Sequence, residues 1–83
     1  MDYVARTPEQ LGQLLRSCRA QRGITQSLAG AKVGLKQSTV SGIELDASRS
    51  SVETLYKLLS SLDLELVLRD KQARTPGRSQ REW

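Results

Sequence analysis

Residues 23–44 read GITQSLAGAKVGLKQSTVSGIE, and this stretch predicts two short helices joined by a tight turn. Thr25 can cap the first helix, because its side-chain oxygen can accept a hydrogen bond from an amide of the opening turn. Gly34 suits the positive φ with which a helix often ends. Beyond the turn, Val40 and Ile43 recur at i and i+3, which predicts one buried face for the second helix.

The other face of the second helix is polar. It carries Gln37, Ser38, Ser41 and Gly42, and Lys36 stands just before it. A short helix with a polar leading end, held by a second helix that crosses behind it, has the geometry that enters the major groove of DNA. The stretch therefore predicts a helix-turn-helix, with helices over about 26–33 and 37–44.

Two further helices are predicted on either side of this motif. Thr7 can cap a helix over 8–21, with Pro8 at its first position and Gln10 completing a capping box. Ser51 can cap another helix over 52–62, after a loop over 45–50. Each has an apolar stripe at helical spacing, formed by Leu11, Leu14, Leu15 and Cys18 in the first, and by Val52, Leu55, Leu58, Leu59 and Leu62 in the second.

After Asp63 the apolar period changes from helical to alternating. Leu64, Leu66 and Leu68 alternate with Glu65, Val67 and Arg69, which predicts a β-strand over about 64–69. Nothing else in the chain alternates, so this strand has no internal partner, and unpaired strand edges are costly. The same strand of a second copy, antiparallel about a two-fold axis, would satisfy it. The alternative is that the preceding helix simply continues through residue 68. The predicted dimer contacts are Leu64, Leu66, Val67 and Leu68.

Composition narrows the classes of function. The 83 residues are enough for one small domain, predicted over 1–70, and they include no His and one Cys. A His-based triad or metal site is excluded, and there is no nucleophile–base pair or phosphate loop, so we expect neither an enzyme nor a cofactor. Cys18 is expected to be a buried hydrophobe. No secretory signal or membrane-spanning run is evident, so we expect a cytoplasmic protein.

The net charge of +4 is unevenly distributed. Residues 16–49 carry six basic side chains against two acidic ones, and residues 71–83 carry four against one. This positive charge coincides with the predicted helix-turn-helix, which favours phosphate binding over an ordinary solvated basic surface.

The last segment, 71–83, reads KQARTPGRSQREW and lacks apolar periodicity. Its composition predicts a flexible, disordered basic tail. It ends in Trp83, the only Trp of the chain, which is suited to anchor in a partner's pocket. The alternative is a terminal residue of no consequence.

Helix-turn-helix regulators of the phage-repressor-like (Xre) class are similar in layout, and the HipB-type antitoxins resemble this chain more closely. The resemblance covers about residues 7–70 and the last two residues. It is carried by Thr25-Gln26-Ser27, Gly34, Lys36-Gln37, Thr39, Ser41 and Glu44, by Leu58-Leu59, Ser61-Leu62, Leu64, Leu68 and Asp70, and by Glu82-Trp83. It implies a mainly α, lambda-repressor-like domain of four to five helices, with one C-terminal strand that pairs across a homodimer.

The resemblance also implies a function. HipB-type proteins bind inverted repeats in their own operon promoter, repress it, and hold the HipA toxin, a serine/threonine kinase, in an inactive complex. Their tail is flexible and can place its terminal Trp on the toxin, a role that would fall to Trp83. A stand-alone Xre-type regulator without a toxin is the second interpretation. Either protein would be bacterial and associated with the nucleoid when bound to DNA.

The candidate DNA-binding residues fall into two groups. Lys36, Gln37, Ser38 and Ser41 are expected to face the bases, where Gln37 can pair with adenine and Lys36 can reach guanine or a phosphate. The second group is expected to face phosphates and comprises Gln26, Ser27 and Thr39. The chain departs from the family where Ala29-Gly30 replaces the usual Leu-Ala pair and Leu28 comes one position early. Either the first helix of the motif rotates to bury Leu28, or Leu28 stays partly exposed.

Overall fold

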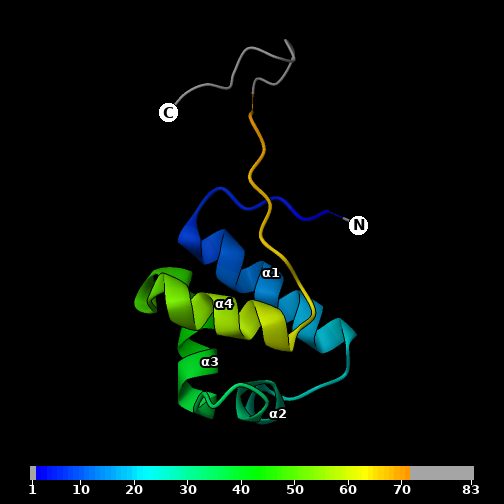
Figure 1. Ribbon diagram of the computed structural model, residues 1–83, viewed down its shortest axis with the longest axis vertical. Coiled ribbons are helices and arrows are strands. Elements are labelled where there is room, and N and C mark those ends of the chain that lie inside the picture. Colours follow the sequence, from blue (N-terminus) through cyan, green and yellow to red (C-terminus); the bar gives the residue numbers. More distant parts are fainter. Residues whose placement is uncertain (1, 72–83) are drawn as a thin grey trace.

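The computed structural model describes residues 2–71, in which four α-helices and one 3₁₀ turn form a single bundle (Figure 1). In chain order the elements are α1 (Pro8–Gln21), α2 (Gln26–Ala31), α3 (Gln37–Leu45), the 3₁₀ turn η1 (Ala47–Arg49) and α4 (Val52–Ser61). All four predicted helices and their first residues are confirmed. Helix α2 is two residues shorter than predicted, and the expected loop over 45–50 contains η1.

The helix starts follow from their capping residues. The hydroxyl oxygens of Thr7, Thr25 and Ser51 each accept a hydrogen bond from the backbone N–H three residues later, at 3.0–3.1 Å. The Gln10 side chain accepts from the backbone N–H of Arg6 (2.7 Å), one residue before the cap, so the capping box is displaced by one position.

The 3₁₀ turn between α3 and α4 is capped in a different way. Asp46 accepts hydrogen bonds from the hydroxyl (2.7 Å) and the backbone N–H (2.9 Å) of Ser48, and these bonds lower the pKa of the Asp46 carboxyl. Asp46 also serves as the C-cap of α3, so it marks a sharp corner between the motif and α4.

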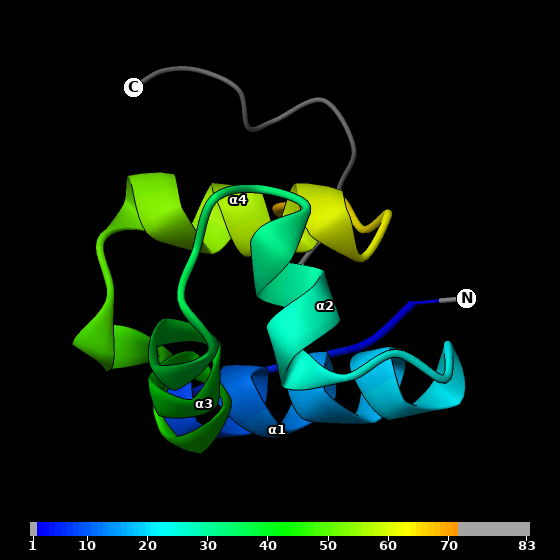
Figure 2. The same cartoon turned by 90° about the horizontal axis from the view of Figure 1, so that it is seen from below.

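The hydrophobic core is small and draws on every helix. Its buried side chains are Leu15, Ala29, Val40, Ile43, Ala47, Leu58, Leu59 and Leu62. Figure 2 shows α2 lying beside α3. Cys18 is buried, as predicted. Val52, in contrast, lies two-thirds exposed at the start of α4, although the apolar stripe predicted it in the core.

Glycine allows the closest helix contacts. A Cβ atom on Gly12 of α1 would lie 2.5 Å from the Ile43 carbonyl oxygen of α3 and 2.7 Å from that of Glu44. A Cβ atom on Gly30 of α2 would lie 2.5 Å from the Leu35 carbonyl oxygen. Both glycines therefore let backbones approach more closely than any larger residue would permit. Gly34 adopts the positive φ (73°) predicted for the turn.

Leu28 remains about half exposed, whereas the next two residues, Ala29 and Gly30, are buried. Helix α2 has thus not rotated to bury Leu28. The small pair Ala29-Gly30 faces the core instead, and Gly30 allows α2 to lie close to the turn that leads into α3.

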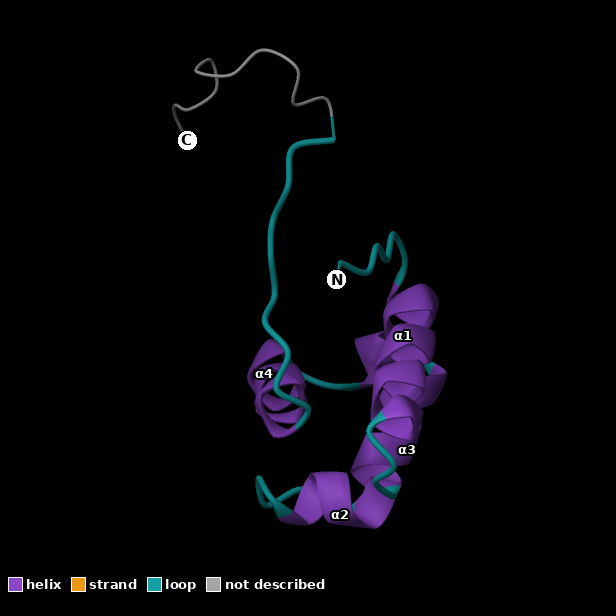
Figure 3. Cartoon of the chain, turned by 90° about the vertical axis from the view of Figure 1, so that its right-hand side faces the viewer, coloured by secondary structure: helices purple, strands orange, loops and turns teal. Residues whose placement is uncertain are grey.

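Beyond α4 the chain leaves the bundle as an extended segment (Figure 3). The alternative that α4 continues through residue 68 is wrong, because the helix ends at Ser61 and Asp63 adopts a positive φ of 58°. Residues 2–71 contain no strand. In a single copy, residues 64–69 could form a strand only if another segment of the same chain paired with them. Pairing across a dimer, with Leu64, Leu66, Val67 and Leu68 as contacts, stays a prediction. Of these four, Leu64 packs on the core, and the other three are exposed.

Gly12→Ala is expected to destabilise the fold by about 1–3 kcal/mol, because the added methyl would overlap two α3 carbonyl oxygens. Gly42→Ala is the matched control within a helix. Its nearest contact would be the Arg49 side chain at 3.8 Å, so it should stabilise by up to about 1 kcal/mol. Urea denaturation followed by circular dichroism measures both. Equal effects of the two substitutions would contradict the close α1–α3 contact.

Candidate nucleic-acid interface

The seven predicted DNA-binding residues gather on two adjacent helix starts. Gln26 and Ser27 open α2, Lys36 is the N-cap of α3, and the remaining four, Gln37, Ser38, Thr39 and Ser41, lie within α3. All seven are at least partly exposed. These seven residues therefore form the polar surface of the α2–turn–α3 unit, whose backbone is seen from below in Figure 2. The division into base-facing and phosphate-facing residues stays a prediction.

A buried carboxylate lies directly behind this surface. Glu44, on the last turn of α3, has a side chain that is only 2% exposed. Its Oε2 accepts a hydrogen bond from Arg19 Nε of α1 at 2.6 Å, and its Oε1 accepts from Arg19 Nη2 at 3.1 Å. This two-pronged contact is the geometry in which arginine binds carboxylates most strongly.

Each of the three nitrogens of the Arg19 guanidinium donates a hydrogen bond to the protein. Besides its two bonds to Glu44, its Nη1 donates to the backbone carbonyl of Ile24 (2.8 Å), in the loop between α1 and α2. The hydrogen bond to Glu44, with the Coulomb attraction between the two charges, raises the pKa of Arg19 despite its burial. The ion pair thus joins α1, the α1–α2 loop and α3.

The same carboxylate orients the exposed face of the motif through two glutamines. Gln26 Nε2 donates to Glu44 Oε1 at 2.9 Å, and Gln37 Nε2 donates to Gln26 Oε1 at 2.6 Å. These bonds hold both side-chain amides, and the exposed Gln37 side chain accepts no hydrogen bond at its amide oxygen within residues 2–71. We name the four residues Arg19, Glu44, Gln26 and Gln37 the polar relay. The relay brings together Gln26 and Gln37, which the sequence placed in different roles.

The first turn of α3 is open to an anion. Lys36 occupies the N-cap, but no side chain accepts a hydrogen bond from the first turn. The free amides and the positive end of the helix dipole favour a phosphate there, next to the exposed Lys36 ammonium. This arrangement supports contact with a nucleic-acid backbone at the same edge where Gln37 is displayed.

Sequence reasoning did not assign roles to Glu44 and Arg19 in this surface. A signal was present, since Glu44 follows Val40 by four residues and Ile43 by one, which places a carboxylate on the buried stripe of α3. A buried carboxylate requires a charged or hydrogen-bonding partner. Arg19, however, is distant in sequence, and only the packing of α1 on α3 identifies it.

Other kinds of site find little support among residues 2–71. Within that range no group of three or more His, Cys, Asp or Glu residues could hold a metal ion. None of the described helices is long and apolar enough to cross a membrane.

The α2–turn–α3 geometry and its polar surface define a helix-turn-helix protein, and the helix-turn-helix family model matches residues 15–68. The antitoxin HipB of Escherichia coli K12 is 34% identical over 80 residues, which cover 93% of this chain and 91% of that protein. Antitoxin HipB of E. coli O6:H1 is 35% identical, with 93% and 85% covered. The chain belongs to the HipB antitoxins within the helix-turn-helix family.

Solved structures agree. The fold matches the HipB–O4 20mer complex with a TM-score of 0.80 at 34% identity, covering 86% of this chain and all of that one. A chain of the HipA–HipB–O2–O3 complex matches with the same values. The restriction-modification controller protein C.Esp1396I matches with a TM-score of 0.65 at 21% identity, over 70% of this chain and 75% of that one, and shares the fold alone.

Glu44→Gln is expected to destabilise the protein by about 3 kcal/mol, the low end for breaking a buried ion pair because Arg19 keeps some exposure. Glu53→Gln removes a carboxylate from the exposed first turn of α4 and should cost at most about 1 kcal/mol. Thermal and urea unfolding of both variants provide the test. A loss for Glu44→Gln no larger than that for Glu53→Gln would show that the pair contributes little to stability.

Proposed function

We propose that this protein is a DNA-binding antitoxin that represses its own operon and neutralises a HipA-like serine/threonine kinase. The observation that carries the proposal is the Gln37 amide, displayed at the open end of α3 and held in place by Gln26 and Glu44. A fixed amide can recognise adenine at low entropic cost, because little side-chain freedom is lost on binding. Similar proteins form a HipB–O4 20mer complex and a HipA–HipB–O2–O3 complex, which supports both partners.

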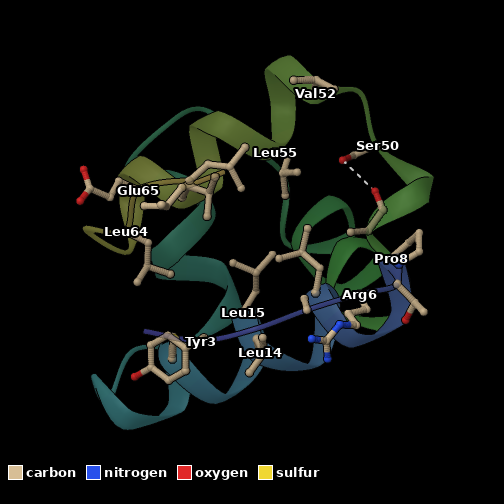
Figure 4. Close-up of a pocket in the computed structure, with 18 of the residues that line it drawn as sticks. Tyr3, Arg6, Pro8, Leu14, Leu15, Ser50, Val52, Leu55, Leu64 and Glu65 are labelled. Atoms are coloured by element: carbon tan, nitrogen blue, oxygen red, sulfur yellow. Dashed lines mark hydrogen bonds between the residues drawn. The ribbon is translucent and has the colours of Figure 1, made fainter. Parts of the chain in front are cut away.

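A homodimer is part of the proposal. An open groove of about 920 Å³ lies between the N-terminal segment, α1, α4 and the segment that follows α4. Figure 4 shows Leu14 and Leu15 from α1, Leu55 from α4, and Leu64 lining it. Leu66 and Val67 also line it, and together with Leu68 they expose apolar surface. Pairing of residues 64–69 with the same segment of a second copy would cover this surface and satisfy the strand.

The dimer would read an inverted repeat, with half-site centres about one helical turn, or a multiple of it, apart. The proposed dimer would act in the bacterial cytoplasm, at the nucleoid when bound to DNA, and it would need no cofactor and carry no enzymatic activity. The second candidate is a stand-alone regulator of the same fold, which the helix-turn-helix alone supports equally well. The two candidates differ only in the kinase partner.

Gln37→Ala is expected to weaken binding to the promoter of the protein's own operon by about ten-fold or more, because one bidentate base contact is lost per half-site. Binding to a random duplex of equal length should change much less. Fluorescence anisotropy titrations measure both affinities, and Gln13→Ala on exposed α1 is the control. Equal weakening on the two duplexes would exclude base recognition by Gln37.

The double substitution Leu66→Asp/Leu68→Asp is expected to yield a monomer, because the paired segments would bring four carboxylates together across the two-fold axis. Leu28→Asp/Leu45→Asp, which alters two exposed leucines on α2 and α3, should leave the dimer intact. Sedimentation equilibrium reports the mass of each. If the Leu66→Asp/Leu68→Asp variant remained dimeric, the dimer interface would lie elsewhere.

Deletion of residues 71–83 is expected to leave affinity for DNA within a few-fold and to loosen a complex with the kinase encoded beside this gene. Trp83 lies outside the described residues and is the proposed anchor on the kinase, so Trp83→Ala should reproduce most of the loss. Co-purification and inhibition of kinase autophosphorylation measure it. Failure of the complete chain to form any complex with the neighbouring gene product would favour the stand-alone regulator.

A further inference from the structure

A second, smaller recess lies beside the polar relay, at the junction of α1 and α3. It has a volume of about 260 Å³ and is lined by Arg16, Arg19, Gln26, Ser41, Glu44 and Leu45. The recess therefore adjoins the polar surface of the motif. It extends that surface toward α1, where none of the predicted DNA-binding residues lies.

Among the charges that line this recess, Arg16 alone has no partner within residues 2–71. Arg19 and Glu44 neutralise each other, and the Glu44 oxygens also accept from Gln26. Arg16, in contrast, is exposed, and no hydrogen bond or ion pair of its side chain occurs within residues 2–71. Glu44 already accepts three hydrogen bonds, two from Arg19 and one from Gln26, and none from Arg16. The recess is thus a polar hollow with a free guanidinium at its edge.

The helical register places this guanidinium on the side that faces DNA in the proposed function. Arg16 follows Gly12 by four residues and precedes Arg19 by three, so all three lie on one face of α1. Gly12 touches the α3 backbone, and Arg19 binds Glu44 of α3. Across the recess, Ser41 follows Gln37 by four residues on the outer face of α3.

From this placement we infer that Arg16 binds a phosphate of the DNA backbone that borders the groove occupied by α3. A duplex seated on Gln37 and Ser41 has its sugar–phosphate strand along the groove edge, next to α1. A guanidinium can donate two parallel N–H bonds to a phosphodiester. The contact positions the protein without reading sequence. The inference rests on the proposed DNA binding.

The test uses the complete chain and measures affinity for the operon promoter and for a random duplex at several KCl concentrations. Arg16→Gln should weaken binding to both duplexes by a common factor of about ten at low salt. The slope of log affinity against log salt should fall in magnitude by about 1 per protomer, or about 2 for the dimer. Arg16→Lys should keep most of the slope, because it retains the charge.

Lys57→Gln is the matched control, because it removes one exposed positive charge from α4, outside the recess. It should leave the slope nearly unchanged. An unchanged slope for Arg16→Gln, or a loss confined to the promoter duplex, overturns the inference and leaves the proposed function standing. If the unaltered protein binds neither duplex, the proposed function fails and the assignment of Arg16 fails with it.

Discussion

The ion pair between Arg19 and Glu44 is the interaction on which the DNA-facing part of the structure depends. Removing a carboxylate from water costs several kcal/mol, and only close, directed bonds offset that cost. Glu44 obtains them from Arg19 and Gln26, at 2.6, 3.1 and 2.9 Å. These bonds are satisfied only when α1, the start of α2 and the end of α3 meet in one arrangement. A carboxylate that would otherwise weaken the core thus selects a single packing of three helices.

Close backbone contacts support the same arrangement without polar groups. Gly12 brings α1 against the α3 carbonyls, and Gly30 brings α2 against the turn before α3. With a core of mainly leucine, valine and alanine and no phenylalanine, the protein has few large side chains to define helix positions. Close backbone contacts at the two glycines and directed hydrogen bonds at Glu44 therefore fix the helix positions that the small core does not fix.

Much of this fold could be predicted from local sequence. Thr7, Thr25 and Ser51 mark helix starts because capping depends on neighbouring residues, and the apolar stripes identify the buried faces. Two features could not be predicted from local sequence, because they depend on how the helices pack and on contacts between residues far apart in the chain. The end of α2 at Ala31 and the exposure of Val52 depend on packing between helices. The Arg19–Glu44 contact joins residues 25 positions apart, and no periodicity in a single sequence indicates it. The sequence predicts the candidate surface, including Gln26 and Gln37, but it does not identify Arg19 and Glu44, which hold these glutamines from behind.

The polar relay also constrains how such a protein can evolve. In the proposed function Gln37 cannot change freely, because its amide is bonded to Gln26, which is bonded in turn to Glu44. A substitution at Gln26 would remove a hydrogen bond from the buried Glu44 carboxylate, and one at Gln37 would remove the partner of the Gln26 amide oxygen. Lys36, Ser38 and Ser41 carry no side-chain hydrogen bonds within residues 2–71 and are free of that double constraint. Paralogues that diverge toward new operators should therefore vary first at these three positions while conserving the relay.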